Sequence, residues 1–277
     1  MAGYVCTIAG GKGGVGKTTT AVNIGVGLQE MGHDVVVVDA DLGMANLGAM
    51  LDIEHDGSLH EILAGEAAVS EALTDGPGGV TVIPGEQRLE AFADADPAKL
   101  RKVIKTLRNA YDAVLIDTGA GLSHDVAVPL GLADGIVLVT TPDDVAVGDT
   151  VKTAELADRI DGTVLGTIIN RVTARTDVEA IEQRFTAPLL AVVPDDKQAT
   201  AAEPLLLEAP DSNAADAFRR VADTMEPLFF DEQADVNDVD VVVQESWFVD
   251  ESDTEPEDGE DETDEEEDSG GVFGLFS

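Results

Sequence analysis

The sequence predicts an α/β fold built on a doubly wound, mostly parallel sheet. Two observations carry this prediction. Seven short segments rich in Val and Ile recur between residues 4 and 194, and helix-like stretches lie between them. The apolar segments are nearly continuous, as expected of strands that are covered on both faces. Strands and helices in alternation are typical of a parallel sheet with helices on both sides.

The predicted elements follow one another in a regular order. The strands are YVCTIA (4–9), DVVVVDAD (34–41), VTVIP (80–84), DAVLIDT (112–118), GIVLVTT (135–141), TVLGTIIN (163–170) and LLAVVP (189–194). The helices are 17–31, 58–65, 97–110, 123–132, 143–160, 177–184 and 212–229. Asp96 before Pro97 is a typical N-cap and first helical residue, and Asp211 or Ser212 can cap the last helix. Functional loops should follow the strands, because ligands of such sheets bind at the carboxyl ends of the strands.

The chain has an extreme net charge of −40. Residues 231–277 hold 20 acidic and no basic residues, which leaves 36 acidic and 16 basic residues, a charge of −20, in residues 1–230. An acidic surface keeps a protein dissolved where salt shortens the Debye length to about 3 Å, so we expect a salt-loving source. The few scattered cations argue against nonspecific binding to nucleic acid.

Cysteine and histidine usage excludes some kinds of site. The single cysteine, Cys6, cannot form a disulfide framework or a CxxC site. The four histidines have no metal-ligand spacing, and we expect surface roles for them: His33, His55, His60 and His124. No run approaches 18 apolar residues, and the N-terminus enters a predicted strand without a basic and apolar leader. We therefore expect a cytoplasmic protein.

Composition divides the chain into four parts. Residues 1–230 are long enough for one large α/β domain. Residues 231–250 include an apolar stretch that could pack on the domain or be recognised as a peptide, and Trp247 within it is either a packing anchor or part of such a peptide. Residues 251–271 form an acidic linker that we expect to be disordered, and residues 272–277 form an apolar tip.

The stretch GGKGGVGKTT, residues 10–19, matches the G-x-x-x-x-G-K-[ST] pattern of phosphate-binding loops. It lies between a predicted strand and a predicted helix, which is the context that the pattern requires. Glycines let backbone N–H groups surround phosphates, and the helix N-terminus adds a favourable dipole. We expect Lys17 to reach the β- and γ-phosphates and Thr18 to ligate Mg²⁺. The candidate nucleotide-binding residues of this loop are Gly11, Lys12, Gly13, Gly14, Val15, Gly16, Lys17, Thr18 and Thr19.

Three carboxylates end predicted strands near this loop. Asp39 and Asp41 end the second strand, and Asp117 ends the fourth. Mg²⁺ prefers oxygen ligands and usually keeps several waters, so we assign Asp117 to the metal through water. Asp41 is the candidate for orienting the attacking water, and Asp39 for supporting one or both. In so acidic a chain, solvated turn aspartates are the alternative.

Lys12 is a second lysine at the mouth of the same loop. Phosphoryl transfer builds negative charge on the γ-phosphate, which a cation supplied from outside can stabilise. Two identical chains that face each other could exchange this lysine across two nucleotides, as a two-fold dimer allows. The alternative is a solvated loop cation.

The loop and the segments around it resemble a known family. KGGVGKTT (12–19) resembles the deviant Walker A signature of the MinD/ParA ATPases, and the resemblance extends to about residue 230. VVDADLGMANLG (37–48) resembles the first switch of the family. DTGAGLS (117–123) resembles the second switch, with Gly119 where the family usually has proline.

Further segments narrow the resemblance. SLHEILAGEA (58–67) and VIPGEQRLEA (82–91) are more similar to MinD than to plasmid ParA, and the chain looks closest to archaeal, specifically haloarchaeal, MinD. LGTIINRV (165–172) and AVVPDDK (191–197) resemble the adenine-pocket segments. The resemblance implies a SIMIBI-type P-loop fold, and it places Asn170, Pro194 and Asp195 beside the adenine.

The resemblance also implies catalytic roles. The signature lysine of the family falls on Lys12, which favours action in the partner subunit, and the catalytic aspartate falls on Asp41. Asp143 and Asp149 fall where the family has acidic residues on the dimer side. The implied function is a slow, Mg-ATP-dependent ATPase that forms a homodimer on ATP and positions the division machinery or a cell-surface apparatus. A ParA-like DNA-partition ATPase and a nucleotide-gated scaffold with little hydrolysis are the alternatives.

The last residues carry a separate hypothesis. The acidic linker is followed by four apolar residues, Val272, Phe273, Leu275 and Phe276. Their position is similar to that of the membrane-targeting helix with which MinD proteins end. One such tip would bind a membrane only weakly. Two tips on one dimer would bind more tightly, because the first tip to bind holds the second close to the membrane. The tip has no Lys or Arg to attract anionic lipid. A docking peptide for a partner protein and an inert terminus are the alternatives.

Overall fold

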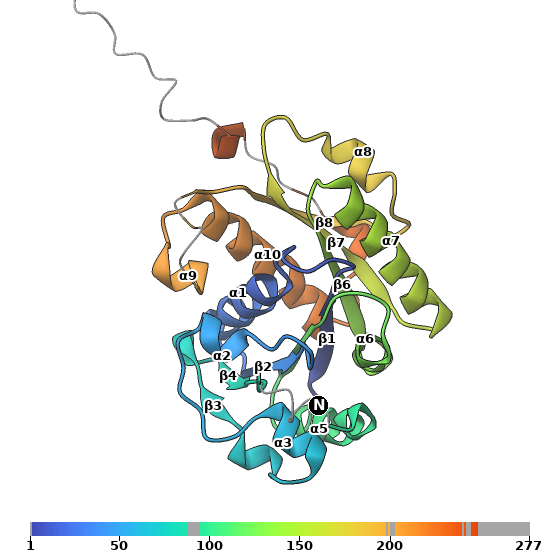
Figure 1. The fold of residues 1–277 in the computed structure, drawn as a ribbon. Coiled ribbons are helices and arrows are strands. Elements are labelled where there is room, and N and C mark those ends of the chain that lie inside the picture. The colour runs from blue at the N-terminus through green and yellow to red at the C-terminus, as the bar shows by residue number, and fades with distance from the viewer. Residues whose placement is uncertain are drawn as a thin grey trace, which may run out of the picture.

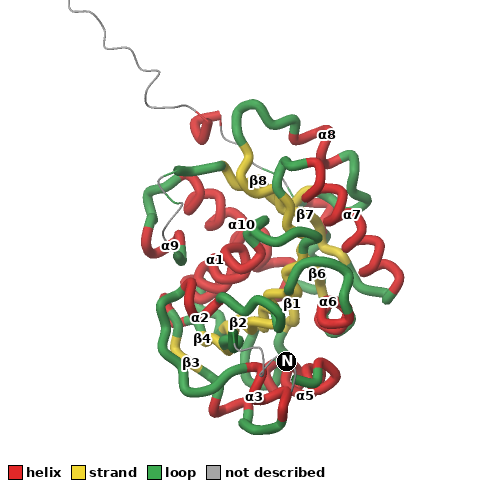
Figure 2. The backbone as a smooth tube through the Cα atoms, in the orientation of Figure 1, coloured by secondary structure: helices red, strands yellow, loops and turns green. Residues whose placement is uncertain are grey.

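The computed structural model describes residues 2–87, 95–197, 199, 203–239, 241 and 245–248. A single eight-stranded sheet runs through the molecule in the order β3-β4-β2-β5-β1-β6-β7-β8, with helices on both faces (Figure 1). Figure 2 shows the same arrangement, with the yellow strands between layers of red helices. The predicted doubly wound α/β fold is confirmed.

All seven predicted strands form and pair in parallel. They are β1 (Tyr4–Ala9), β2 (Val35–Ala40), β4 (Thr81–Ile83), β5 (Ala113–Thr118), β6 (Gly135–Thr140), β7 (Val164–Val172) and β8 (Leu189–Pro194). The sequence analysis missed β3 (Thr74–Asp75), which pairs antiparallel with β4 at the sheet edge. Its two residues are too few to leave an apolar run. Within the sheet, Asp39 is paired in register with Asp117.

The predicted helices also form. The α-helices are α1 (Lys17–Glu30), α2 (Leu47–Met50), α3 (Leu59–Ala64), α5 (Leu100–Leu107), α6 (His124–Leu130), α7 (Asp144–Arg159), α8 (Val178–Glu182), α9 (Leu205–Glu208) and α10 (Asn213–Phe230). The single-turn helices α2 and α9 were not predicted. Asp96 caps a first 3₁₀ turn, Pro97–Lys99, through Ala98 N–H. Ser212, and not Asp211, caps α10, because its hydroxyl oxygen accepts from Ala215 N–H.

Alternate residues of each central strand pack into two hydrophobic cores, one on each face of the sheet. Val35 and Val37 of β2 pack with α1 and α10 on one face of the sheet. Val36 and Val38 pack with α3 and α5 on the other face. Both faces of the central strands are therefore buried, which explains their unbroken apolar runs. This packing fixes the carboxyl ends of the strands, and the loops that follow them, along one edge of the sheet.

The chain after α10 folds back on the domain. Val236, Val239 and Phe248 pack against the core on the α10 face. Trp247 is 7% exposed, and its Nε1 donates to Asp216 Oδ2 at 3.3 Å. Trp247 is thus a packing anchor, one of the two roles that the sequence left open. The predicted linker, residues 251–271, and the tip with Val272, Phe273, Leu275 and Phe276 lie outside the described residues.

None of the helices in the described part of the chain has the length and hydrophobicity that crossing a bilayer requires.

Candidate functional site

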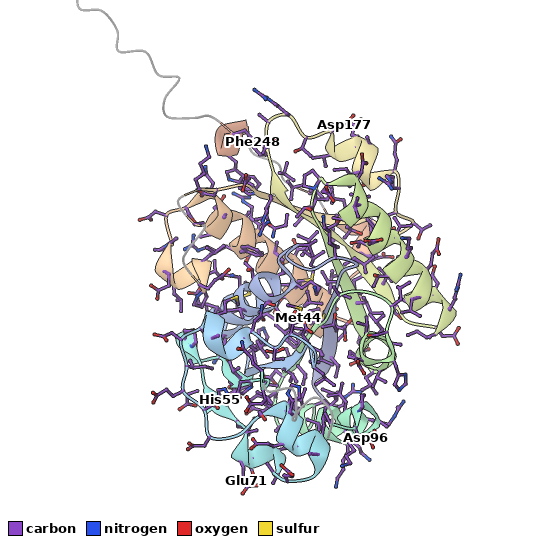
Figure 3. All side chains as sticks on the ribbon, in the orientation of Figure 1. Met44, His55, Glu71, Asp96, Asp177 and Phe248 are labelled. Carbon is purple, nitrogen blue, oxygen red and sulfur yellow. The ribbon has the colours of Figure 1, made fainter. Side chains whose placement is uncertain are left out.

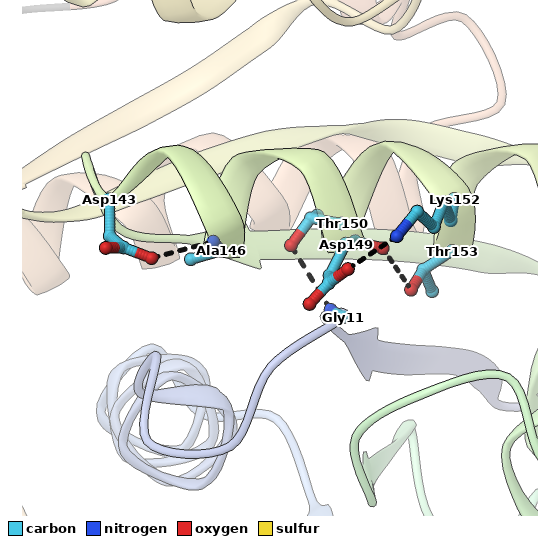
Figure 4. Close-up of polar contacts among 7 residues, drawn as sticks. All are labelled: Gly11, Asp143, Ala146, Asp149, Thr150, Lys152 and Thr153. Atoms are coloured by element: carbon cyan, nitrogen blue, oxygen red, sulfur yellow. Dashed lines mark hydrogen bonds and ion pairs between the residues drawn. The ribbon is translucent and has the colours of Figure 1, made fainter.

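The glycine-rich loop connects β1 to α1, as the pattern requires. Gly16 is the N-cap of α1 and has φ of 99°, a left-handed conformation that favours glycine. A Cβ at this position would collide with the side-chain amide of Asn170. Gly11 N–H donates to the Thr150 hydroxyl at 3.2 Å, so helix α7 supports the start of the loop (Figure 4). The loop is therefore held from two sides by β7 and α7.

Thr18 and Asp117 lie together at the end of the loop. Thr18 Oγ1 is 2.6 Å from Asp117 Oδ2 and 3.2 Å from Asn46 Oδ1. Asp117 is 1% exposed, and its Oδ1 has no hydrogen-bond partner among the described residues. Hydroxyl and carboxylate oxygens suit Mg²⁺, and an unpaired buried carboxylate oxygen is a position where a metal-bound water can donate. The predicted metal pair is thus brought together, and its atoms fit the ion.

The electrostatics of Asp117 point to the same conclusion. Burial, followed by the neighbouring charge of Asp39, raises the pKa of Asp117 to about 8. The hydrogen bond from Thr18 and the charge of Lys17 lower this pKa in part. A buried anion with too little compensation gains from a cation. No group of three or more His, Cys, Asp or Glu in the described chain is arranged to hold a metal. Thr18 would bind Mg²⁺ directly, and Asp117 would bind it through water.

Asp39 holds the segment that follows β2. It is fully buried, and its Oδ2 accepts from the N–H groups of Asn46 and Leu47 at 3.0 Å. Its Oδ1 accepts from Asp41 N–H at 3.2 Å. Burial raises the pKa of Asp39, and these N–H donors lower it again. With its oxygens used in this way, Asp39 holds the backbone at Asp41, Asn46 and Leu47. Its predicted support of the metal residue Asp117 stays a prediction.

Asp41 lies where the two switch-like segments meet. Its Oδ1 accepts from Met44 N–H at 3.1 Å. A Cβ at Gly119 would approach this same oxygen to 3.0 Å, closer than side chains tolerate without displacement. Gly119 therefore lies directly beside the carboxylate of Asp41, and the end of β5 contacts the segment that follows β2.

Lys12 makes an ion pair within its own chain. Lys12 Nζ lies 3.0 Å from Asp143 Oδ1, and both side chains are about half exposed. Asp143 also caps α7 through Ala146 N–H (Figure 4), and the hydrogen bond from Lys12 lowers the pKa of Asp143. Asp149, on the same helix, pairs with Lys152 at 2.8 Å. Lys12 thus stands at the surface of the site and does not pack into it.

The three predicted adenine-side residues lie at the ends of β7 and β8. Asn170 is 7% exposed, and its Nδ2 donates to Val15 O at 3.0 Å. Pro194 ends β8, and Asp195 N–H donates to Val172 O at 2.8 Å, which holds the two strand ends together. Asn170 therefore contacts the phosphate loop directly, which the sequence could not show.

The expectation of a surface role is wrong for His60. This side chain is fully buried. His60 Nε2 lies 2.9 Å from Leu42 O, and Nδ1 accepts from Glu86 N–H at 2.9 Å. It bridges the segments after β2 and β4, so its ring nitrogens are satisfied by backbone. Spacing that excludes a metal site does not exclude such a structural bridge.

Other residues of the site were missed from the sequence. Asn46 meets Thr18, and Thr150 meets Gly11. Asn23 and Glu203 meet behind the loop, with Nδ2 and Oε2 3.1 Å apart. Each belongs to a separate loop or helix, and no spacing pattern joins them. Asn23 alone left a signal, as an amide within the otherwise apolar run 21–28 of helix α1.

Comparisons with known proteins agree with this geometry. A family model described as an AAA domain matches residues 3–160. An uncharacterized ATP-binding protein of Methanocaldococcus jannaschii is 37% identical over 223 residues, which cover 78% of this chain and 84% of that protein. The cell division ATPase MinD of Pyrococcus furiosus is 38% identical with a TM-score of 0.77, over 82% of this chain and 99% of that one.

A second solved structure is similar to the same extent. The septum site-determining protein MinD of Pyrococcus horikoshii, in complex with Mg-ADP, is 35% identical with a TM-score of 0.76. The match covers 81% of this chain and 96% of that one. A phosphate loop on a parallel sheet, paired Thr18 and Asp117 at its end, and relatives matched over nearly their whole length lead to one conclusion: this chain belongs to the MinD/ParA family of P-loop ATPases.

Proposed function

We propose that this protein is a Mg-ATP-dependent switch that dimerises on ATP, hydrolyses it slowly and positions the division machinery or a cell-surface apparatus. The observation that carries the proposal is the hydrogen bond between Thr18, at the end of the glycine loop, and the buried Asp117. The two Pyrococcus relatives are named for cell division and septum placement, which supports the positioning role.

The residues of the loop would bind the nucleotide. Backbone N–H groups of residues 12–19 would surround the phosphates, because Gly11 N–H already donates to Thr150. Lys17, which is 7% exposed, would supply a positive charge. Thr18 and, through water, Asp117 would hold Mg²⁺, which neutralises charge on the phosphate oxygens. Asn170, Pro194 and Asp195 would form the adenine side. Asn170 contacts the loop at Val15 O, and Asp195 is bonded to Val172 O of the same strand, so base and phosphates would share the support of β7.

Asp41 would orient the attacking water. Met44 N–H anchors one of its oxygens at 3.1 Å, which leaves the other to accept from water. Asp39 fixes the backbone of this segment from below. The charge of Asp41 thus stays beside the γ-phosphate position without a strong partner of its own.

A second copy of the chain would complete the site. Three large apolar side chains are exposed on loops and a helix start around it: Met44 (79%), Leu122 (53%) and Val145 (60%) (Figure 3 shows Met44). We infer that a second chain covers these side chains in the dimer, because the centre of a protein–protein interface is enriched in apolar side chains. The Lys12–Asp143 pair is a half-exposed surface ion pair, which contributes little to stability, so Lys12 can leave it for a nucleotide bound to the partner subunit.

Two variants test the switch. Light scattering of the wild type should show a doubling of mass with Mg-ATP at the preferred ionic strength. Lys12→Ala should not hydrolyse ATP, and Asp41→Ala should bind it with little turnover. A wild type that stays monomeric in saturating Mg-ATP and still turns over normally would refute the dimer. ATP-dependent retention on DNA would favour the ParA-like alternative, and a wild type that binds ATP without turnover would favour the scaffold.

We propose further that residues 272–276 attach the ATP-bound dimer to the inner face of the membrane. The supporting observations are the four apolar residues of the sequence and the anchoring of the preceding segment by Trp247. Flotation with lipid vesicles should depend on ATP and be lost when residues 272–276 are deleted. Binding to a protein partner without vesicles would favour a docking peptide, and no change on deletion would favour an inert terminus.

A further inference from the structure

A polar cluster lies behind the phosphate loop, in the otherwise apolar contact between α1 and the chain that follows β8. Asn23, in the second turn of α1, is fully buried. Its Nδ2 donates to Thr19 O at 2.8 Å and to Glu203 Oε2 at 3.1 Å, and its Oδ1 accepts from Leu206 N–H at 3.1 Å. The amide is therefore satisfied by three partners, two of which come from a segment about 180 residues away.

Glu203 is the charged member of this cluster. Its Oε2 accepts from the Asn23 amide at 3.1 Å, and the Thr19 hydroxyl and Leu205 N–H lie close enough to the carboxylate to lower its pKa. Burial raises the pKa of Glu203, and these donors lower it in part. Burying a carboxylate costs free energy unless donors compensate, and a Leu or Met would fill the space without that cost. The stability of the α1 contact alone does not explain an acid here.

The position of Thr19 suggests what the acid does. Thr19 is the last residue of the phosphate loop and lies in the first turn of α1, where backbone N–H groups lack partners within the helix and are available to phosphate. On the other side, Glu203 lies nine residues after Pro194, at the end of the segment that leaves the adenine side. The carboxylate thus links α1, whose first turn ends the loop, to the chain that follows β8.

We propose that Glu203 is a positioning residue of the nucleotide site, which holds Thr19 and Asn23 and so fixes the phosphate loop against the adenine-side segment. The inference rests on the proposed nucleotide binding. Glu203 would act on the nucleotide through Asn23 and Thr19 and not by touching the base or the phosphates itself. Its loss should weaken nucleotide binding and leave the rate at saturation nearly unchanged, because the groups that surround the γ-phosphate, Asp41 and Asp117, stay in place.

The experiment compares variants of the full chain by calorimetric titration with Mg-ATP and by steady-state turnover. Glu203→Ala should weaken ATP binding about tenfold, equivalent to about 1.4 kcal/mol, and raise KM with kcat within twofold. Glu203→Gln keeps an acceptor oxygen for Asn23, while its amide can donate to the Thr19 oxygen, so its affinity should stay within threefold of the wild type. Glu208→Ala, exposed on α9, is the matched control and should change neither.

A double-mutant cycle separates positioning from a general brace. Thr19→Val and Glu203→Ala should be non-additive in ATP affinity if they act through one hydrogen bond. If Glu203→Ala lowers the melting temperature but binds ATP as the wild type does, Glu203 is only a structural brace and the inference is wrong. If Glu203→Ala fails to fold, the ATP affinities of Thr19→Ser, which keeps the hydroxyl, and Thr19→Val, which lacks it, are compared instead. Equal ATP affinities of these two variants would refute the inference. A wild type that does not bind ATP would instead refute the proposed function.

Discussion

Replacing Asp117 with Asn tests the electrostatics of the site. The pKa of Asp117 is about 8 in the folded chain, against 3.8 for an ordinary aspartate. The folded state therefore binds this proton more tightly than the unfolded state. The stability that the protonated form contributes is present at low pH and is lost as the pH rises from 3.8 through 8.

The structure sets the size of this effect. One pKa unit corresponds to about 1.4 kcal/mol. The unfolding free energy should therefore fall by up to about that amount for each unit by which the pH rises towards 8. Between pH 6 and pH 8 the wild type should lose about 2–3 kcal/mol through Asp117 alone. Asp117→Asn cannot titrate. The unfolding free energy of this variant should therefore not fall between pH 6 and pH 8 through residue 117. Any cost of the unpaired amide is the same at each pH.

Urea denaturation in EDTA at pH 6, 7 and 8 measures the difference. The gap in unfolding free energy between Asp117→Asn and the wild type should shift by about 2–3 kcal/mol in favour of the variant over this range. Asp158→Asn, at an exposed position of α7, is the control and should follow the wild type. In a second arm, Mg-ATP should raise the melting temperature of the wild type much more than that of Asp117→Asn. Equal pH slopes in the two proteins would refute the electrostatic reasoning, and an equal Mg-ATP response would refute the metal role.

Three further substitutions probe other parts of the structure. Trp247→Ala removes a buried side chain and should cost at most about 3–5 kcal/mol of unfolding free energy. Each kcal/mol should lower the melting temperature by roughly 2–4 °C, and an unchanged melting temperature would contradict the packing role. Gly16→Ala should abolish ATP binding in titration calorimetry, because its Cβ would collide with Asn170 at a left-handed φ; wild-type affinity would argue against the loop geometry. Met44→Ser should reduce ATP-dependent mass doubling in light scattering, whereas Met31→Ser, exposed at the far end of α1, should not; equal effects would remove Met44 from the interface.

Much of the fold was predictable because its signals are local. Continuous Val and Ile runs predict strands buried on both faces, and all seven formed. Helix caps such as Asp96 were legible because a cap depends on the next few residues. β3, α2 and α9 were missed because two to four residues leave no periodic pattern.

The phosphate loop and the strand-end aspartates were likewise predictable. The signal for each lies in a few consecutive residues, and the parallel sheet places these residues at one edge. Residues 10–19 carry the whole pattern. The carboxyl ends of parallel strands must meet, which brings Asp117 to Thr18 across 99 residues. The placement of His60 failed, because a buried histidine bridge between two backbone segments has no spacing rule.

The sequence by itself determined the sheet, the loop and the residue types available for phosphate and metal, since these depend on neighbours along the chain. Only the tertiary structure decided that Lys12 rests on Asp143, that Asn170 touches the loop backbone, and that Glu203 reaches Asn23. Those contacts join residues 131 to 180 positions apart. Their partners are chosen by how helices and strand ends pack in three dimensions, and no local pattern encodes that choice.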